Sequence, residues 1–255
     1  STFNYPVLIG DIGGTNARFA LVIASHAEPK HFDSLATADF STPLEAIQEG
    51  VLNKTSLRPR TAILAVAGPV EGDEIALTNT HWVVEPRRLI EEFELEEVIV
   101  LNDYEAQAMS LSALKPDDIE PLTDRETDPF GPKVILGPGT GLGVAAMVNG
   151  RGVWMPIPGE GGHIDLAPVT KRDFEYWPHL ETIGGRVSAE QVVCGRGMVN
   201  LYNALCATAG TKPKFEKPAE ISEAGLQKSD PIAEETLKLF AIHLGRVAGN
   251  LALIY

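Results

Sequence analysis

Two glycine-rich turns, each set between apolar runs, constrain what this chain can fold into. The turns are residues 13–16 and 137–141, more than 120 residues apart. The apolar runs that flank them are residues 5–10, 17–24, 133–136 and 142–148. Short apolar runs joined by glycines are typical of β-hairpins, and the repeated opening indicates a duplicated architecture. We therefore expect two lobes facing each other across a cleft, a small α/β domain over 1–112 and a large one over 113–255.

Strand-like and helix-like segments alternate along the rest of the chain, which is typical of the α/β class. Further strands are expected over 61–67 and 97–101. Helices are expected over 43–52, 85–93, 103–114, 188–207 and 231–255. The last helix has apolar residues at helical spacing and reaches the end of the chain without a capping residue. We expect the C-terminal part of the protein to be missing from this chain.

Composition excludes several classes of partner. The 35 acidic and 21 basic side chains give a net charge of −14, whereas nucleic acids and anionic membranes attract a positive surface. No apolar run approaches the roughly 18 residues of a membrane helix, and the first residues lack the features of a signal peptide. Cys194 and Cys206 are too few for a disulfide scaffold or a zinc site. They indicate free thiols in a reducing cytoplasm.

The glycine turns could hold phosphate groups. Neither turn matches the Walker A pattern or the dinucleotide-binding pattern Gly-x-Gly-x-x-Gly. Residues 13–15 and 139–141 nevertheless offer backbone N–H groups that a phosphate can approach, together with threonine hydroxyls. Asp11, at the end of a strand, could hold Mg²⁺ through water. The alternative is a pair of tight hairpins with no ligand.

Polar residues suited to a polyol gather in the middle of the chain. Asn102 and Asp103 follow a buried strand, where α/β proteins place ligands, although either could simply cap the next helix. Glu160 and His163 lie in a glycine-rich loop that presents them, and packing is the alternative for the histidine. Glu190 opens a predicted helix, where it could bind a ligand or only complement the helix dipole. Carboxylates, amides and imidazoles together both donate to and accept from sugar hydroxyls.

These motifs, taken in order, resemble bacterial glucokinases, which are ATP-dependent sugar kinases of the hexokinase/actin-like superfamily. The resemblance covers residue 5 to the end of the chain. The motifs are Gly10-Asp11-Ile12-Gly13-Gly14-Thr15-Asn16-Ala17-Arg18, Leu101-Asn102-Asp103, Gly139-Thr140-Gly141-Leu142-Gly143, Pro158-Gly159-Glu160-Gly161-Gly162-His163 and Ser188-Ala189-Glu190.

The resemblance implies a two-lobed ribonuclease-H-like fold and phosphorylation of glucose at O6, the first step of glycolysis. It implies Asp103 as catalytic base. It implies glucose contacts at Asn79, Asn102, Asp103, Glu160, His163 and Glu190. It implies ATP contacts at Gly10, Asp11, Ile12, Gly13, Gly14, Thr15, Asn16, Gly139, Thr140 and Gly141, with Mg²⁺ at Asp11. A homodimer is the expected assembly.

Zinc is not expected, because Ile164-Asp165-Leu166-Ala167-Pro168 stands where related sugar kinases carry a cysteine-rich motif. Three alternatives stay open at this stage. One is a kinase of another hexose, such as fructose or an N-acetylated amino sugar. The second is a sugar-binding sensor without catalysis. The third is an actin-like filament or chaperone ATPase, which would lack the Glu-Gly-Gly-His loop.

Overall fold

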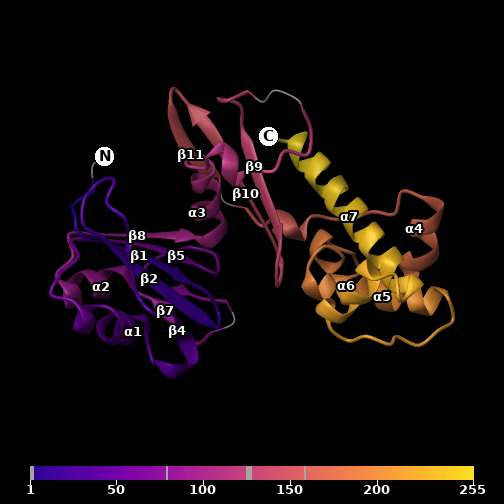
Figure 1. The fold of residues 1–255 in the computed structure, drawn as a ribbon, viewed down its shortest axis with the longest axis horizontal. Coiled ribbons are helices and arrows are strands. Elements are labelled where there is room, and N and C mark those ends of the chain that lie inside the picture. The colour runs from indigo at the N-terminus through magenta and orange to yellow at the C-terminus, as the bar shows by residue number, and fades with distance from the viewer. Residues whose placement is uncertain (1–2, 79, 125–127, 158) are drawn as a thin grey trace. The chain divides into compact units, whose positions relative to one another are not determined.

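The chain folds into two compact units, Ser1–Gln107 and Ala108–Tyr255. The computed structural model describes residues 3–255 except residues 79, 125–127 and 158 (Figure 1). Each unit has its own buried apolar core and is described by itself. The assignment of 1–112 and 113–255 as a small and a large domain stays a prediction.

The first unit is built on a mixed sheet with the strand order β3-β2-β1-β5-β8, in which β4 also pairs with β2. Its strands are β1 (Val7–Ile12), β2 (Asn16–Val22), β3 (Lys30–His31), β4 (Leu35–Ala36), β5 (Thr61–Val66) and β8 (Glu97–Asn102). β1 and β2 form an antiparallel hairpin, and β5 and β8 continue the sheet in parallel with β1. This topology confirms the ribonuclease-H-like fold. A separate ribbon joins β6 (Ile75–Ala76) to β7 (Val83–Val84).

The helices of this unit begin at the predicted residue or, for α2, one residue after it. α1 (Pro43–Gly50) is capped by Thr42, whose hydroxyl accepts a hydrogen bond from the Glu45 backbone N–H at 3.2 Å. α2 (Pro86–Phe93) has proline at its first position, where the missing N–H costs nothing. Both pack on one face of the sheet (Figure 1) and close a core that includes Leu8 and Leu64. α3 (Asp103–Ser110) follows β8 and ends before Leu114, the expected end.

The second unit opens with the same kind of hairpin. β9 (Lys133–Pro138), β10 (Leu142–Gly150) and β11 (Val153–Ile157) form an antiparallel sheet with the order β11-β10-β9. The register pairs Pro138 with Leu142 across the turn. In the first unit, β3, β2 and β1 have the corresponding order. The duplicated opening predicted from the glycine turns is therefore present.

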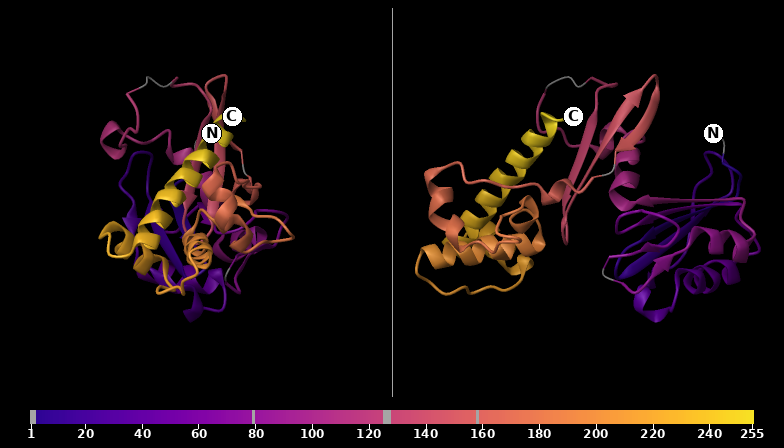
Figure 2. Two further views of the ribbon diagram at one scale, coloured as in Figure 1. Left: turned by 90° about the vertical axis from the view of Figure 1, so that its right-hand side faces the viewer. Right: turned by 180° about the vertical axis from the view of Figure 1, so that it is seen from behind.

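The helices that follow this sheet are α4 (Lys171–Tyr176), α5 (Gly195–Thr208), α6 (Pro218–Leu226) and α7 (Pro231–Ala252). α5, α6 and α7 pack against one another (Figure 2). Short 3₁₀ turns complete the chain: η1 (Thr37–Asp39), η2 (Leu52–Lys54), η3 (Pro116–Asp118), η4 (Gly161–His163), η5 (Trp177–His179) and η6 (Ala189–Gln191). β11, α4 and α6 lie where the sequence pattern predicted no element.

The prediction of a single helix over 188–207 is wrong. The chain instead forms η6, turns inward and starts α5 at Gly195, where the Cys194 sulfur accepts a hydrogen bond from the Gly197 N–H at 3.2 Å. Gly197 passes so near Val192 that a Cβ would lie 2.6 Å from its carbonyl carbon. Local apolar spacing could not reveal this close approach, because it depends on the path of the whole segment.

Candidate active site

The first glycine turn is closed by its own backbone and held by a buried threonine. The Gly13 N–H donates to the Asn16 carbonyl at 2.9 Å. Thr37, 3% exposed, donates its hydroxyl to the Gly14 carbonyl and its N–H to the Thr15 carbonyl, both at 2.9 Å. Thr37 is a positioning residue that the sequence analysis missed, because no motif connects it to the turn.

Two residues of the predicted nucleotide motif also have a packing role. Ile12 is fully buried, so only its backbone can face a ligand. A Cβ on Gly10 would lie 2.7 Å from the Leu64 side chain and 3.0 Å from the Phe19 ring. The packing of the neighbouring strands β5 and β2 therefore requires a glycine at position 10.

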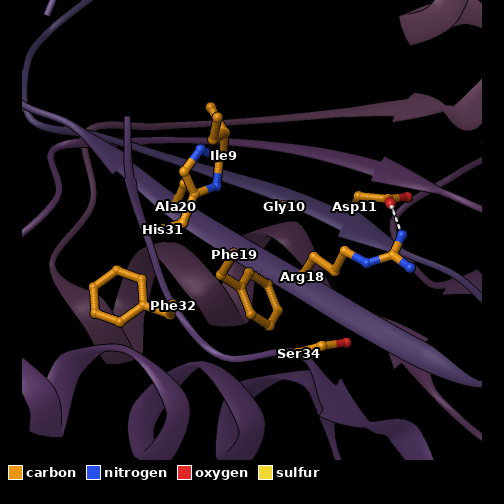
Figure 3. Close-up of a pocket in the computed structure, with 9 residues that line it drawn as sticks. All are labelled: Ile9, Gly10, Asp11, Arg18, Phe19, Ala20, His31, Phe32 and Ser34. Atoms are coloured by element: carbon orange, nitrogen blue, oxygen red, sulfur yellow. Dashed lines mark hydrogen bonds and ion pairs between the residues drawn. The ribbon is translucent and has the colours of Figure 1, made fainter. Parts of the chain in front are cut away.

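Asp11, the predicted metal ligand, pairs with the residue opposite it on β2. Its carboxylate lies 3.2 Å from the Arg18 guanidinium (Figure 3), and both side chains are more than half exposed. The pair lines a cavity of about 370 Å³ over β1, β2 and β3. No cluster of three or more His, Cys, Asp or Glu side chains suited to a metal occurs in the described part of the chain. One exposed carboxylate fits a magnesium ion that is held mainly by substrate phosphates.

Parallel pairing brings the first turn and the middle motif to one edge of the sheet. Ile12 is in register with Val66, and Val66 with Asn102. The turn after β1 and the pair Asn102-Asp103 after β8 thus follow carboxyl ends at the same edge of the sheet, with β5 between them. This is the edge at which α/β proteins bind ligands.

Asn102 ties this edge together. Its amide donates to the Gly68 carbonyl, and its side-chain oxygen accepts from the Tyr104 N–H, both at 2.9 Å. The Glu105 carboxylate accepts from the Asn102 N–H at 2.9 Å, and one Asp103 carboxylate oxygen also accepts from Tyr104. Asn102 therefore does cap α3. Glu105 was missed, although Asn-x-x-Glu is a capping signal in the sequence.

In the second unit, the second turn is anchored at two points by one later segment. The Gly139 N–H donates to the Gly141 carbonyl at 2.8 Å, and the Gly139 carbonyl accepts from the Gly195 N–H at 2.9 Å. The Glu190 carboxylate accepts from the Leu142 N–H at 2.9 Å. Glu190 lies in a 3₁₀ turn rather than an α-helix, so the helix-dipole alternative loses its basis.

The glycine-rich loop rests on the same strand end. A Cβ on Gly162 would clash with the Leu142 carbonyl oxygen, and one on Gly161 would lie 2.8 Å from the Val144 side chain. The Glu160 carboxylate and the His163 ring lie 3.9 Å apart and are 72% and 49% exposed. The packing alternative for His163 is therefore not supported.

One arginine fixes the end of this loop. Arg186 donates to the His163 carbonyl and to the Asp165 carboxylate, both at 2.7 Å. A backbone hydrogen bond also holds the end of the loop, because the Ala189 N–H donates to the Ile164 carbonyl at 2.9 Å. η4 and η6 thus pack together on β10. The second turn, the glycine-rich loop and Glu190 are one cluster.

Comparison with known proteins identifies the family. The family model described as Glucokinase matches residues 8–255. The chain belongs to the glucokinase family. The glucokinase of Rhizobium etli is 55% identical over 98% of this chain and 74% of its own length. Among solved structures, a glucokinase from an Antarctic psychrotroph matches with a TM-score of 0.88 and 32% identity, over 99% of this chain and 80% of its own. A Balamuthia mandrillaris glucokinase solved with glucose matches with a TM-score of 0.80 and 25% identity, over 97% and 76% of the two chains.

For this glucokinase-family chain, the predicted site residues divide between the units. Asn102, Asp103 and the first turn lie in the first unit, and the second turn, Glu160, His163 and Glu190 lie in the second. Asn79 lies outside the described residues. No helix in the described ranges is long and apolar enough to cross a membrane.

Proposed function

We propose that this chain transfers the γ-phosphoryl group of ATP to the O6 hydroxyl of glucose, giving glucose 6-phosphate and ADP. Membership of the glucokinase family across residues 8–255 is the observation that carries this proposal. The gathering of Asn102, Asp103 and the first turn at one carboxyl edge supports it.

Asp103 is the proposed base. It is half-buried at the start of α3, where the Tyr104 N–H fixes one carboxylate oxygen. In the proposed step it takes the proton of the 6-hydroxyl as that oxygen attacks phosphorus and the bond to ADP breaks. An ordinary aspartate is a weak base, but phosphoryl transfer depends mainly on positioning and charge stabilisation, so a late proton transfer suffices.

The remaining polar residues are proposed to orient the sugar. The proposed sugar contacts are Glu160, His163, Glu190, Asn102 and Asn79. Neighbouring hydroxyls of a pyranose suit carboxylates, which accept two hydrogen bonds at once.

The two glycine turns are proposed to hold the phosphates of ATP through backbone N–H groups. Magnesium, proposed beside Asp11, would neutralise phosphate charge when bound. The Asp11–Arg18 pair is exposed and therefore weak, so the carboxylate can exchange partners. A homodimer and a cytoplasmic location are also proposed, on family resemblance alone.

The test measures glucose 6-phosphate formation, coupled to NADP reduction, with ATP and magnesium on the complete product of the gene. We expect glucose-dependent turnover, most of which is lost in Asp103→Asn. Fructose and an N-acetylated amino sugar are assayed in parallel. Turnover with one of these and none with glucose would overturn the substrate, and ATP hydrolysis independent of any sugar would overturn the reaction.

A further inference from the structure

We propose that Glu190 is a positioning residue for the second phosphate turn as well as a sugar contact, so that the sugar site and the nucleotide site form together. This inference rests on the proposed function. It assigns the carboxylate two tasks, with one oxygen bonded to the turn and the other directed to the sugar.

The first step is the bond to Leu142. Leu142 is the residue directly after the turn and is 4% exposed, and its N–H donates to Glu190 Oε2 at 2.9 Å. A buried N–H without a partner is costly, so the carboxylate stabilises this position of β10. Glu190 Oε1 accepts no hydrogen bond from the part of the chain that the structure describes. That oxygen is available to a hydroxyl.

The second step is the space that Gly141 leaves. A Cβ on Gly141 would lie 2.5 Å from Glu190 Oε2 and 3.3 Å from its carboxyl carbon. The glycine therefore lets the carboxylate lie directly against the turn. A methyl group there would displace the carboxylate, the flexible end of the side chain, rather than the backbone.

The third step is the second anchor. The Gly195 N–H donates to the Gly139 carbonyl at 2.9 Å. Residues 190–195 therefore bond to the turn at Gly139 and to the residue directly after it, Leu142. Between the anchors, the Cys194 thiol donates to the Glu190 carbonyl at 3.0 Å. A sugar that holds Glu190 in place would thereby hold the turn, and a nucleotide in the turn would hold Glu190. Such coupling between two ligands is reciprocal.

The decisive experiment compares two alanine variants of the same turn. Gly141→Ala pushes on Glu190, whereas a Cβ on Gly139 would meet nothing closer than the Gly141 carbonyl at 4.0 Å. Glucose affinity is measured by titration calorimetry without nucleotide. Gly141→Ala should weaken glucose binding about tenfold, the size expected for a lost hydrogen bond to a charged group. Gly139→Ala should stay within about twofold of the parent, whatever its effect on ATP.

A second pair of variants separates positioning from sugar contact. Glu190→Gln keeps an oxygen that can accept from Leu142, and Glu190→Ala does not. With glucose saturating, Glu190→Ala should raise the KM for ATP about tenfold, and Glu190→Gln should change it less than about twofold. Both should raise the KM for glucose.

The outcomes are distinguishable. An active parent in which the two glycine variants bind glucose equally, or in which Glu190→Ala leaves the KM for ATP unchanged, overturns the inference and leaves the proposed function standing. A parent that neither binds nor phosphorylates glucose overturns both.

Discussion

The hydroxyl of Tyr176 and the Nε2 atom of His243 lie 2.7 Å apart, and both side chains are fully buried in the second unit. Tyr176 also lies 3.1 Å from the Asp173 carboxylate and donates its proton there, because a carboxylate can only accept. His243 Nε2 must therefore carry a proton and donate it to the Tyr176 hydroxyl oxygen. Its other nitrogen faces the Arg246 guanidinium at 3.5 Å, and Arg246 donates to Asp173 at 2.7 Å. The network holds a neutral histidine.

The pH dependence of stability should report this histidine. Burial lowers the pKa of His243 to about 4, and the charge of Arg246 acts in the same direction. Below the unfolded pKa of about 6.5 the unfolded chain binds a proton that the folded chain excludes, so stability falls as the pH falls towards 4. Between pH 7 and pH 5, His243 should cost about 2 kcal/mol of the free energy of unfolding.

Urea unfolding at the two pH values measures this loss. The glutamine side chain of His243→Gln does not titrate, so in this variant the loss of unfolding free energy between pH 7 and pH 5 should be smaller by about 2 kcal/mol. His179→Gln removes an exposed histidine of the same unit and should retain the parent's pH dependence. An unchanged pH dependence in His243→Gln would remove His243 as its source.

Asp103→Asn should bind glucose but lose turnover. The amide keeps the shape and the oxygen that accepts from Tyr104, but it cannot take the proton of the hydroxyl. We expect kcat to fall about a hundredfold to ten-thousandfold, the usual contribution of a general base, with the glucose dissociation constant within about twofold of the parent. Steady-state kinetics and calorimetry check the two parts. A kcat near that of the parent would exclude Asp103 as the base.

Glu160→Gln should affect the sugar far more than the nucleotide. The carboxylate is 72% exposed at the loop and 3.9 Å from His163. It therefore contributes little to the stability of the fold. We expect the KM for glucose to rise about tenfold and that for ATP less than about twofold. Glu216→Gln, at another exposed glutamate of the same unit, should change neither constant. Equal rises in both constants for Glu160→Gln would point to a folding role instead.

Gly162→Ala should destabilise the second unit. Its Cβ would clash with the backbone oxygen of Leu142, which cannot move without disturbing β10. We expect a loss of about 1–3 kcal/mol in the free energy of unfolding, typical of overpacking. Gly159→Ala is the matched control, because its Cβ meets no described atom within 4 Å. The midpoints of urea unfolding should separate the two variants, and equal midpoints would contradict the close packing of this loop on β10.

The sequence alone predicted the parts of the site that depend on local chemistry. The two glycine-turned hairpins and the position of Asn102-Asp103 at a strand end follow from strand periodicity and turn composition, which act over a few residues. The cap of α1 by Thr42 has the same local origin. The prediction of a helix over 188–207 was wrong, because apolar spacing alone does not distinguish one continuous helix from a 3₁₀ turn followed by a shorter helix.

Tertiary structure decided what holds those parts in place. Glu190 reaches Leu142 across 48 residues, and Thr37 closes a turn 23 residues away. His243 meets Tyr176 across 67 residues. None of these pairings has a local signal, because a hydrogen bond between distant side chains exists only after the sheets and helices have packed. The residue types at the site were thus readable from the sequence, whereas their anchors follow from the path of the folded chain.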